Sequence, residues 1–161
     1  MRKDDPRVEA YGAVDEANAA LGLCRCSAPA EIAALLGTVQ AELLHVGADL
    51  AAPEGERPGG LARVGEDEVA ALERAIDHWT ALVPPLRHFV LPAGGPAAAA
   101  LHVARTTVRR AERRAVTLAG ETECNPAVLR YLNRLSDLLF VLARVAAQQG
   151  GVAEEPWIPR R

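Results

Sequence analysis

Apolar residues recur at intervals of three and four positions in five segments of the chain, a pattern typical of amphipathic α-helices. The segments cover about residues 6–26, 32–52, 66–82, 97–119 and 126–150. In the first segment, one face would carry Val8, Tyr11, Val14, Asn18, Leu21 and Arg25. No stretch alternates apolar and polar residues as a strand does, and the sequence contains no internal repeat. The pattern therefore predicts an all-α helical bundle that forms one domain over residues 1–161.

Prolines and glycines mark where the predicted helices start and stop. Asp5 followed by Pro6 suits a helix start, because aspartate caps a first turn and proline fits its first position. The stretches "APEGERPGG" and "VPPLRHFVLPAGGP" hold too many helix-breaking residues to be helical, so we expect loops there. We expect the final stretch, "VAEEPWIPRR", to be extended.

The composition narrows the classes of protein that fit. Half of the residues are hydrophobic and the formal net charge is -3, so no global charge attracts nucleic acid or anionic lipid. No apolar run reaches the roughly 18–20 residues of a membrane span, and the N-terminus lacks the apolar core of a signal peptide. The three cysteines lack paired spacing, which indicates reduced thiols in a cytoplasmic protein.

The stretch "RTTVRRAERR", residues 105–114, puts five arginines and one glutamate into ten positions. On a helix, the core stripe would consist of Leu101, Ala104, Val108, Ala111, Ala115 and Leu118. A neighbouring face, called here the arginine face, would carry Arg105, Arg109, Glu112 and Arg113. His102 lies beside this face, whereas Arg110 and Arg114 point elsewhere.

The residues alone leave three interpretations of the arginine face open. It could be a solvated face with ion pairs between neighbouring turns. It could grip nucleic acid, although no aromatic residues interleave with the arginines. It could bind a polyphosphate, because arginine forks match phosphate oxygens in pairs and keep their charge when buried.

Two further predicted helices carry polar residues next to their core stripes. On the last helix, one face would hold Asn133, Asp137, Phe140 and Arg144. On the first helix, Asp15 lies one turn after Tyr11. Each feature alone is ordinary, but together with the arginine face they indicate a site.

Four blocks of sequence resemble one family. The blocks "DDPRVEAYGAVDEANAALG", "FVLPAGG", "LHVARTTVRRAERRAV" and "YLNRLSDLLFVLAR" are similar to those of the PduO-type ATP:cob(I)alamin adenosyltransferases, in the family's order and over nearly all of the chain. The resemblance implies a five-helix bundle with ferritin-like up-down packing, assembled into a homotrimer with active sites between subunits. It also implies transfer of the 5′-deoxyadenosyl group of ATP to cob(I)alamin, with release of triphosphate.

The resemblance further implies roles for particular residues. The ATP contacts would be Lys3, Arg109, Arg110, Glu112, Arg113 and Asn133, with Glu112 also near Mg²⁺. Arg105 would pair with Asp15 across the subunit interface, and both would join Arg109 and Phe89 in the catalytic set. Phe89 would close the lower face of the corrin, and Phe140 would extend that apolar wall. Further implied partners are a cobalamin reductase and an adenosylcobalamin-dependent mutase.

This chemistry agrees with what the residues showed independently. Triphosphate leaves as the C5′–O bond breaks, so fixed cations would stabilise the charge that develops on its oxygens. The Co(I) centre is itself the nucleophile, and no protein nucleophile is needed. An apolar residue that excludes the lower axial ligand of cobalamin would make reduction to Co(I) easier.

The chain departs from the family pattern at two places. The family carries a Gly/Thr-rich stretch before the lysine, and this sequence begins at "MRKDD" without it. Either the stretch lies outside the sequence at hand, or the chain is a truncated relative with impaired ATP binding. The second departure is Ala93, which stands after Pro92 where the family usually has glycine.

Two rival interpretations have less support. A ferritin-like metal protein would explain Glu42 and His45 at ExxH spacing, but a di-iron bundle needs two such motifs and two more glutamates. A non-catalytic bundle of this family that binds or senses nucleotide or cobalamin is the other rival. Turnover to triphosphate would exclude it.

Overall fold

The computed structural model describes residues 2–53, 55, 56 and 58–160. Within those residues the secondary structure is five α-helices and one short 3₁₀ turn, with a single isolated β-bridge in place of any strand. The helices are α1 (Pro6–Arg25), α2 (Ala30–Ala51), α3 (Glu66–Thr80), α4 (Pro96–Glu121) and α5 (Pro126–Gln149), and the turn is η1 (Pro58–Gly60). The predicted all-α bundle is confirmed, and no helix bound differs from the predicted one by more than two residues.

The helix starts follow the predicted capping chemistry. Asp5 accepts a hydrogen bond from the backbone N–H of Arg7 at 2.9 Å, and Pro6 takes the first helical position. At α5, Asn125 accepts from the N–H of Ala127 at 3.1 Å, again with proline at the first position. Both caps satisfy donors that a helix end leaves without an intrahelical partner.

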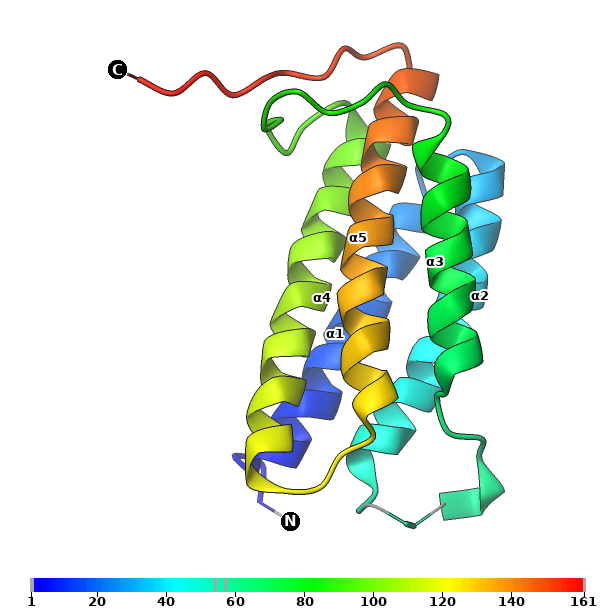
Figure 1. Cartoon of the computed structure of the whole chain (residues 1–161), viewed down its shortest axis with the longest axis vertical. Helices are drawn as coiled ribbons and strands as arrows, with labels where there is room; N and C mark the ends of the chain where they lie inside the picture. The colour runs from blue at the N-terminus through cyan, green and yellow to red at the C-terminus, as the bar shows by residue number, and fades with distance from the viewer. Residues whose placement is uncertain (1, 54, 57, 161) are drawn as a thin grey trace.

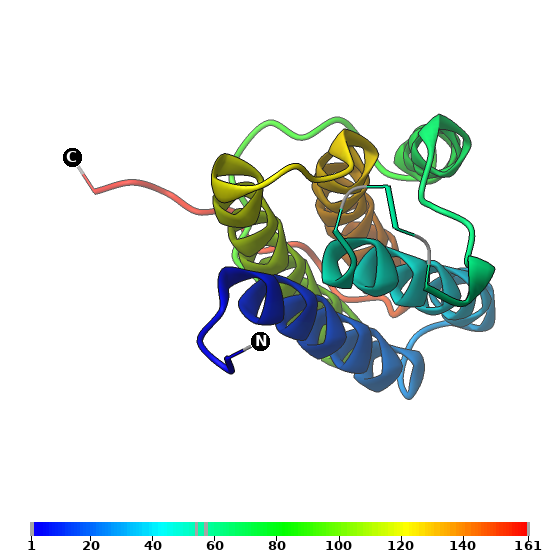
Figure 2. The same ribbon diagram turned by 90° about the horizontal axis from the view of Figure 1, so that it is seen from below.

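The helices run along one axis and share a single core (Figure 1). Helix α1 packs against α2 and α4, and α5 packs against α4 and α3. Seen from below, α1 lies alongside α4, while α3 lies at the outer edge of the bundle (Figure 2). Helix α5 is buried on most of its circumference, because it contacts helices on several sides.

The predicted core stripe of α4 is confirmed, whereas that of α1 was partly wrong. All six predicted α4 residues are buried. On α1, the buried face is Arg7, Ala10, Ala13, Val14, Ala17, Leu21 and Cys24. Val8, Tyr11 and Asn18 are only half-buried and Arg25 is exposed, whereas Ala10, Ala13 and Ala17 are buried. Small side chains allow two helix backbones to approach closely, so an alanine face, rather than the face with the largest residues, became the core.

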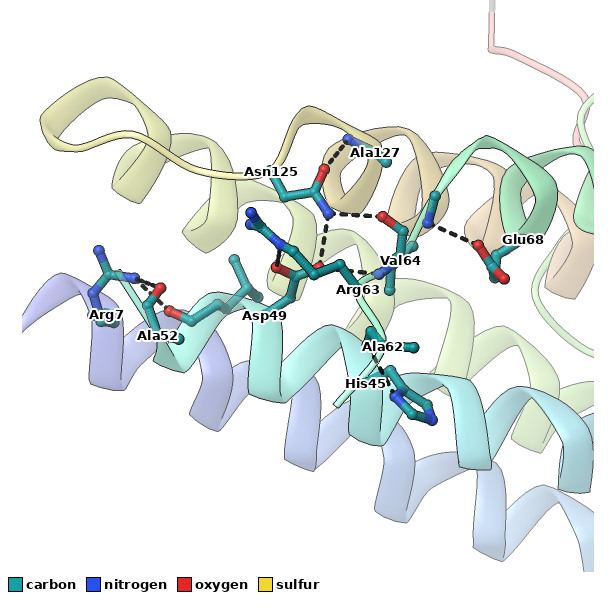
Figure 3. A network of polar contacts seen from close by, with 12 residues as sticks. Arg7, His45, Asp49, Ala52, Ala62, Arg63, Val64, Glu68, Asn125 and Ala127 are labelled. Atoms are coloured by element: carbon teal, nitrogen blue, oxygen red, sulfur yellow. Dashed lines mark hydrogen bonds and ion pairs between the residues drawn. The ribbon is translucent and has the colours of Figure 1, made fainter. Parts of the chain in front are cut away.

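A polar joint ties α2, the segment before α3 and the start of α5 together (Figure 3). The Asp49 carboxylate, whose side chain is 2% exposed, accepts hydrogen bonds from Arg63 Nε at 2.6 Å and from Val64 N at 3.1 Å. It also accepts from Asn125 Nδ2 at 2.7 Å, and the same amide donates to the Val64 carbonyl. Nearby, buried Arg7 donates to the carbonyls of Leu50 and Ala52 and so caps the C-terminus of α2.

The predicted loop between α3 and α4 and the predicted extended C-terminal segment lie together at one end of the bundle, away from the N-terminus (Figure 1). Gly94 holds the loop against α5. Its φ is 111°, and a Cβ there would lie 2.8 Å from the Cβ of Ala147. Because a side chain would meet both backbone strain and a clash, glycine is required at this position.

Candidate functional site

The arginine face lies beside the groove between α4 and α5. Core residue Val108 is fully buried, so Arg109 and Glu112 emerge at the edge of the buried stripe next to α5. From α5, Asn133 meets them one position after buried Leu132. Helical spacing on two antiparallel helices therefore collects these polar groups at one level of the bundle.

These residues line a pocket of about 300 Å³ formed by Arg109, Glu112, Arg113, Val116 and Asn133. Four of these five residues were predicted as ATP contacts. Only Val116, exposed on α4, was missed, because nothing in its sequence context separates it from other surface valines. The pocket holds two guanidinium groups and one carboxylate, so it carries net positive charge.

Hydrogen bonds orient the polar groups of the pocket. Asn133 Nδ2 donates to Glu112 Oε1 at 2.9 Å, and Arg113 Nη1 donates to the Arg109 carbonyl at 3.3 Å. Asn133 Oδ1 in turn accepts from Arg134 Nη2 at 2.6 Å. The Arg109 guanidinium makes no hydrogen bond or ion pair with any other described residue, so its donors are available to an anion.

Arg105 lies one turn before Arg109 and is half-buried. Its Nε atom is buried and has no hydrogen-bond partner among the described residues. Burial and the neighbouring charge of Arg109 lower the pKa of Arg105. A buried donor without an acceptor is costly, so this atom needs an acceptor that the described residues do not supply.

Further along the same two helices, two aromatic rings are in contact. The rings of His102 on α4 and Phe140 on α5 meet edge-on, with centroids 6.1 Å apart. Seven residues of helix separate Phe140 from Asn133, a rise of about 10 Å. The charged pocket and this aromatic pair therefore lie at two levels of the same pair of helices.

Phe89 lies in the loop at the end of the bundle and is 76% exposed. Its ring meets the ring of Trp157 edge-on, with centroids 6.3 Å apart. Leu91 and Ile158 are also exposed there. Together, Phe89, Leu91, Trp157 and Ile158 are called here the apolar end face.

Besides Arg105, Phe89 and Phe140, three further predicted site residues lie outside the pocket within this one chain. Arg110 forms an ion pair with Glu16 of α1 and lines a different pocket, of about 310 Å³, on the α1 side of α4. Lys3 is exposed in the turn before α1. Asp15 is exposed on α1 and makes no ion pair with Arg105 in the described part of the chain. Their roles toward ATP and the interface stay predictions.

The rival metal motif finds no support in the described residues. Glu42 lines a mainly apolar groove between α2 and α3. The Nδ1 atom of His45 lies 3.3 Å from the Ala62 carbonyl (Figure 3). Across the described ranges, no group of three or more His, Cys, Asp or Glu residues is placed to hold a metal ion. Nor does any described helix combine the length and apolarity needed to cross a membrane.

Comparison with known proteins assigns the chain to one class. Residues 1–146 match the family model described as cobalamin adenosyltransferase. The corrinoid adenosyltransferase PduO of Citrobacter freundii is 50% identical over 146 residues, covering 89% of this chain and 43% of that protein. The corrinoid adenosyltransferase of Bacillus subtilis is 43% identical over 157 residues, covering 94% of this chain and 80% of that protein.

Solved structures agree with this assignment. A variant of the PduO-type ATP:corrinoid adenosyltransferase from Lactobacillus reuteri, complexed with cobalamin and ATP, superposes with a TM-score of 0.90 at 37% identity, covering 98% of this chain and 88% of that one. The chain belongs to the cobalamin adenosyltransferase family. It spans less than half the length of the two PduO relatives from Citrobacter freundii and Salmonella typhimurium.

Proposed function

We propose that this protein transfers the 5′-deoxyadenosyl group of ATP to cob(I)alamin, forming adenosylcobalamin and releasing triphosphate. One observation carries the proposal. Arg109 and Arg113 place two guanidinium groups, with Glu112 and Asn133, in one pocket between α4 and α5, and the Arg109 guanidinium has no partner among the described residues. Fixed cations without a partner suit the phosphates of a nucleotide, and the His102–Phe140 ring contact lies further along the same two helices.

In this proposal, Arg109 and Arg113 bind the triphosphate of ATP. Their guanidinium groups are permanently charged and can each engage two phosphate oxygens. Asn133 holds the Glu112 carboxylate at 2.9 Å, which keeps the acid from pairing with both arginines. The arginines would stabilise the triphosphate as it takes the electron pair of the breaking C5′–O bond.

The donor set also fits Mg²⁺ bound together with ATP. Glu112 is a half-buried carboxylate in the pocket, and Mg²⁺ bound to nucleotides needs only one or two protein carboxylates besides phosphate oxygens and water. Glu112 would therefore hold the ion, which supplies additional charge stabilisation to the phosphates when bound.

The electron balance needs no protein nucleophile. The Co(I) centre of the substrate supplies the electron pair for the new Co–C5′ bond, and triphosphate leaves with the pair of the C5′–O bond. The protein's task is to align these atoms and exclude water. Phe140 and the exposed ring of Phe89 are the residues we assign to the corrinoid.

We further propose that the chain acts as a homotrimer in the cytoplasm, with Asp15 of one subunit paired with Arg105 of the next. Arg105 has a buried Nε donor without a partner, and Asp15 is an exposed carboxylate. The carboxylate of Asp15 would supply the acceptor and the opposite charge that Arg105 needs. In the assembled site, Lys3 and Arg110 would also contact ATP. A cobalamin reductase would supply the reduced substrate, and an adenosylcobalamin-dependent mutase would use the product.

The test is anaerobic turnover with reduced cobalamin, ATP and Mg²⁺, followed by the visible spectrum and by triphosphate release. We expect Arg109→Ala to lower kcat/KM by about 100-fold, the size typical for loss of one charge-stabilising group. Arg114→Ala is the matched control, because Arg114 lies on the other side of α4 near Glu9 and outside the pocket.

The outcomes separate the alternatives. Turnover that is lost in Arg109→Ala and kept in Arg114→Ala supports the proposal. ATP binding without any corrinoid chemistry in the unaltered chain would instead favour the nucleotide-sensing protein. Equal losses in both variants would show that the pocket is not the triphosphate site.

A further inference from the structure

We propose that Arg144 is a positioning residue for the corrinoid, acting through the loop that carries Phe89. Its guanidinium ties the C-terminal segment and the α3–α4 loop to the same point of α5. The three groups, Arg144, Glu154 and the Pro84 carbonyl, are called here the latch. The positioning role rests on the proposed adenosyltransferase function, whereas the latch is defined by the hydrogen bonds of Arg144 and does not depend on that function.

The latch is built around a buried cation. Arg144 is 7% exposed although it lies near the C-terminal end of α5. Its Nε donates to Glu154 Oε1 at 2.6 Å, and its Nη2 lies 3.3 Å from Glu154 Oε2. The same Nη2 donates to the Pro84 carbonyl at 2.8 Å. One guanidinium fork thus holds two segments that are 70 residues apart in sequence numbering.

Beyond the latch, the two segments pair with each other. Val90 and Pro156 form an antiparallel bridge. The Leu91 N–H donates to the Glu155 carbonyl at 2.8 Å, and the Trp157 N–H donates to the Phe89 carbonyl at 2.7 Å. This bridge is what places the Trp157 ring against the Phe89 ring, so the position of Phe89 depends on the C-terminal segment.

The bridge alone is a weak restraint. It consists of two backbone hydrogen bonds next to exposed residues, where water competes for the same groups. Ordering an extended segment costs conformational entropy at every residue. A buried, charge-assisted fork is much stronger than neutral exposed hydrogen bonds, and Arg144 is the buried group that anchors both segments. We therefore infer that the latch decides whether the bridge forms.

The arrangement explains an otherwise unfavourable surface. Four large apolar residues, Phe89, Leu91, Trp157 and Ile158, are exposed at the end of the bundle. Exposed apolar patches on a protein of this size mark binding surfaces. When the hydrogen bonds of the latch are formed, the rings of Phe89 and Trp157 make one edge-on pair that an extended apolar ligand can contact.

The experiment compares Glu154→Gln with Glu155→Gln in the full chain. Glu154→Gln keeps the side-chain length but removes the charge that the Arg144 fork binds. Glu155→Gln is the matched control, because Glu155 contributes only its carbonyl to the bridge. Arg144→Lys is a second test, since lysine keeps the charge but cannot hold both segments with one planar fork.

Two measurements are made on each variant. The first is amide hydrogen exchange at Leu91 and Trp157, the two donors of the bridge. The second is steady-state kinetics with the KM for cob(I)alamin and the KM for ATP determined separately. We expect Glu154→Gln and Arg144→Lys to lose protection at both amides and to raise the cob(I)alamin KM by about tenfold, with the ATP KM unchanged. Glu155→Gln should match the unaltered chain.

Each alternative result overturns a defined part of the proposal. Protection that persists in Glu154→Gln would refute the latch. Lost protection with unchanged cob(I)alamin KM would refute the positioning role alone, and equal rises in both KM values would indicate a general structural defect. An unaltered chain with no turnover would refute the proposed function and the positioning role with it, while the exchange data would still decide the latch.

Discussion

His102 is a titratable residue that the fold buries without a hydrogen-bond partner for one of its ring nitrogens. The residue is 5% exposed, and its Nδ1 atom is buried without a hydrogen-bond partner in the described structure. Burial lowers the pKa of His102 below its ordinary value of 6.5, the nearby Arg105 charge lowers it further, and Glu154 opposes the shift. The folded chain therefore favours the neutral form of the His102 imidazole.

This preference predicts a pH dependence of stability. The unfolded chain binds a proton at His102 near pH 6.5 and the folded chain does so only at lower pH, so stability is highest above that value and falls as the pH drops below it. We expect the free energy of unfolding in urea to fall more between pH 7.5 and 5.5 in the unaltered chain than in His102→Phe. His88→Gln, at an exposed histidine, should behave like the unaltered chain. Identical pH profiles for all three would refute the assignment.

At the scale of elements, the Asp49 carboxylate joins three segments by hydrogen bonds and takes no part in the proposed chemistry. It collects donors from the segment before α3 and from the cap of α5 while standing on α2. Three parts of the chain that are far apart in sequence thus depend on one buried carboxylate. Buried charges are tolerated only when fully hydrogen-bonded, which this one is on both oxygens.

Asp49→Asn should therefore be strongly destabilising. The introduced amide would direct N–H donors at the donors of Val64 or Asn125, leaving buried groups unpaired. We expect a loss of about 3 kcal/mol in the free energy of unfolding, measured by urea denaturation. Asp77→Asn, at an exposed position of α3, should change stability by less than about 0.5 kcal/mol. A similar small effect at Asp49 would mean that the joint contributes little.

At the scale of the whole molecule, the single chain leaves complementary groups unpaired. Asp15 and Arg105 lie on α1 and α4, and neither forms an ion pair with the other in the described chain. By contrast, the adjacent Glu16 already pairs with Arg110 within the chain. This difference is why Asp15, rather than Glu16, is proposed to reach another subunit.

The assembly can be tested by charge reversal. We expect Asp15→Arg to shift the mass in light scattering from three times the 17.1-kDa chain mass toward one, because it places like charges together. The double variant Asp15→Arg with Arg105→Asp should recover the trimer in part. Glu16→Gln is the control and should leave the mass unchanged. A mass of one chain for the unaltered protein would refute the homotrimer.

The sequence by itself determined the five helices, the Asp5 cap of the first one and most of the candidate pocket. Helical periodicity and the Asp-Pro and Asn-Pro starts are local, because each depends on residues within one or two turns. Arg109, Glu112 and Arg113 share a face for the same local reason. The family blocks then connected this face with Asn133 on another helix.

Only the tertiary structure decided which groups meet across the bundle. It turned the face of α1 that carries Ala10, Ala13 and Ala17 toward the core and left Tyr11 half-buried at its edge. It also brought Arg144 to Glu154 and Trp157 to Phe89. Pairings between distant segments depend on how the helices pack and where the loops return, and no local periodicity encodes that information.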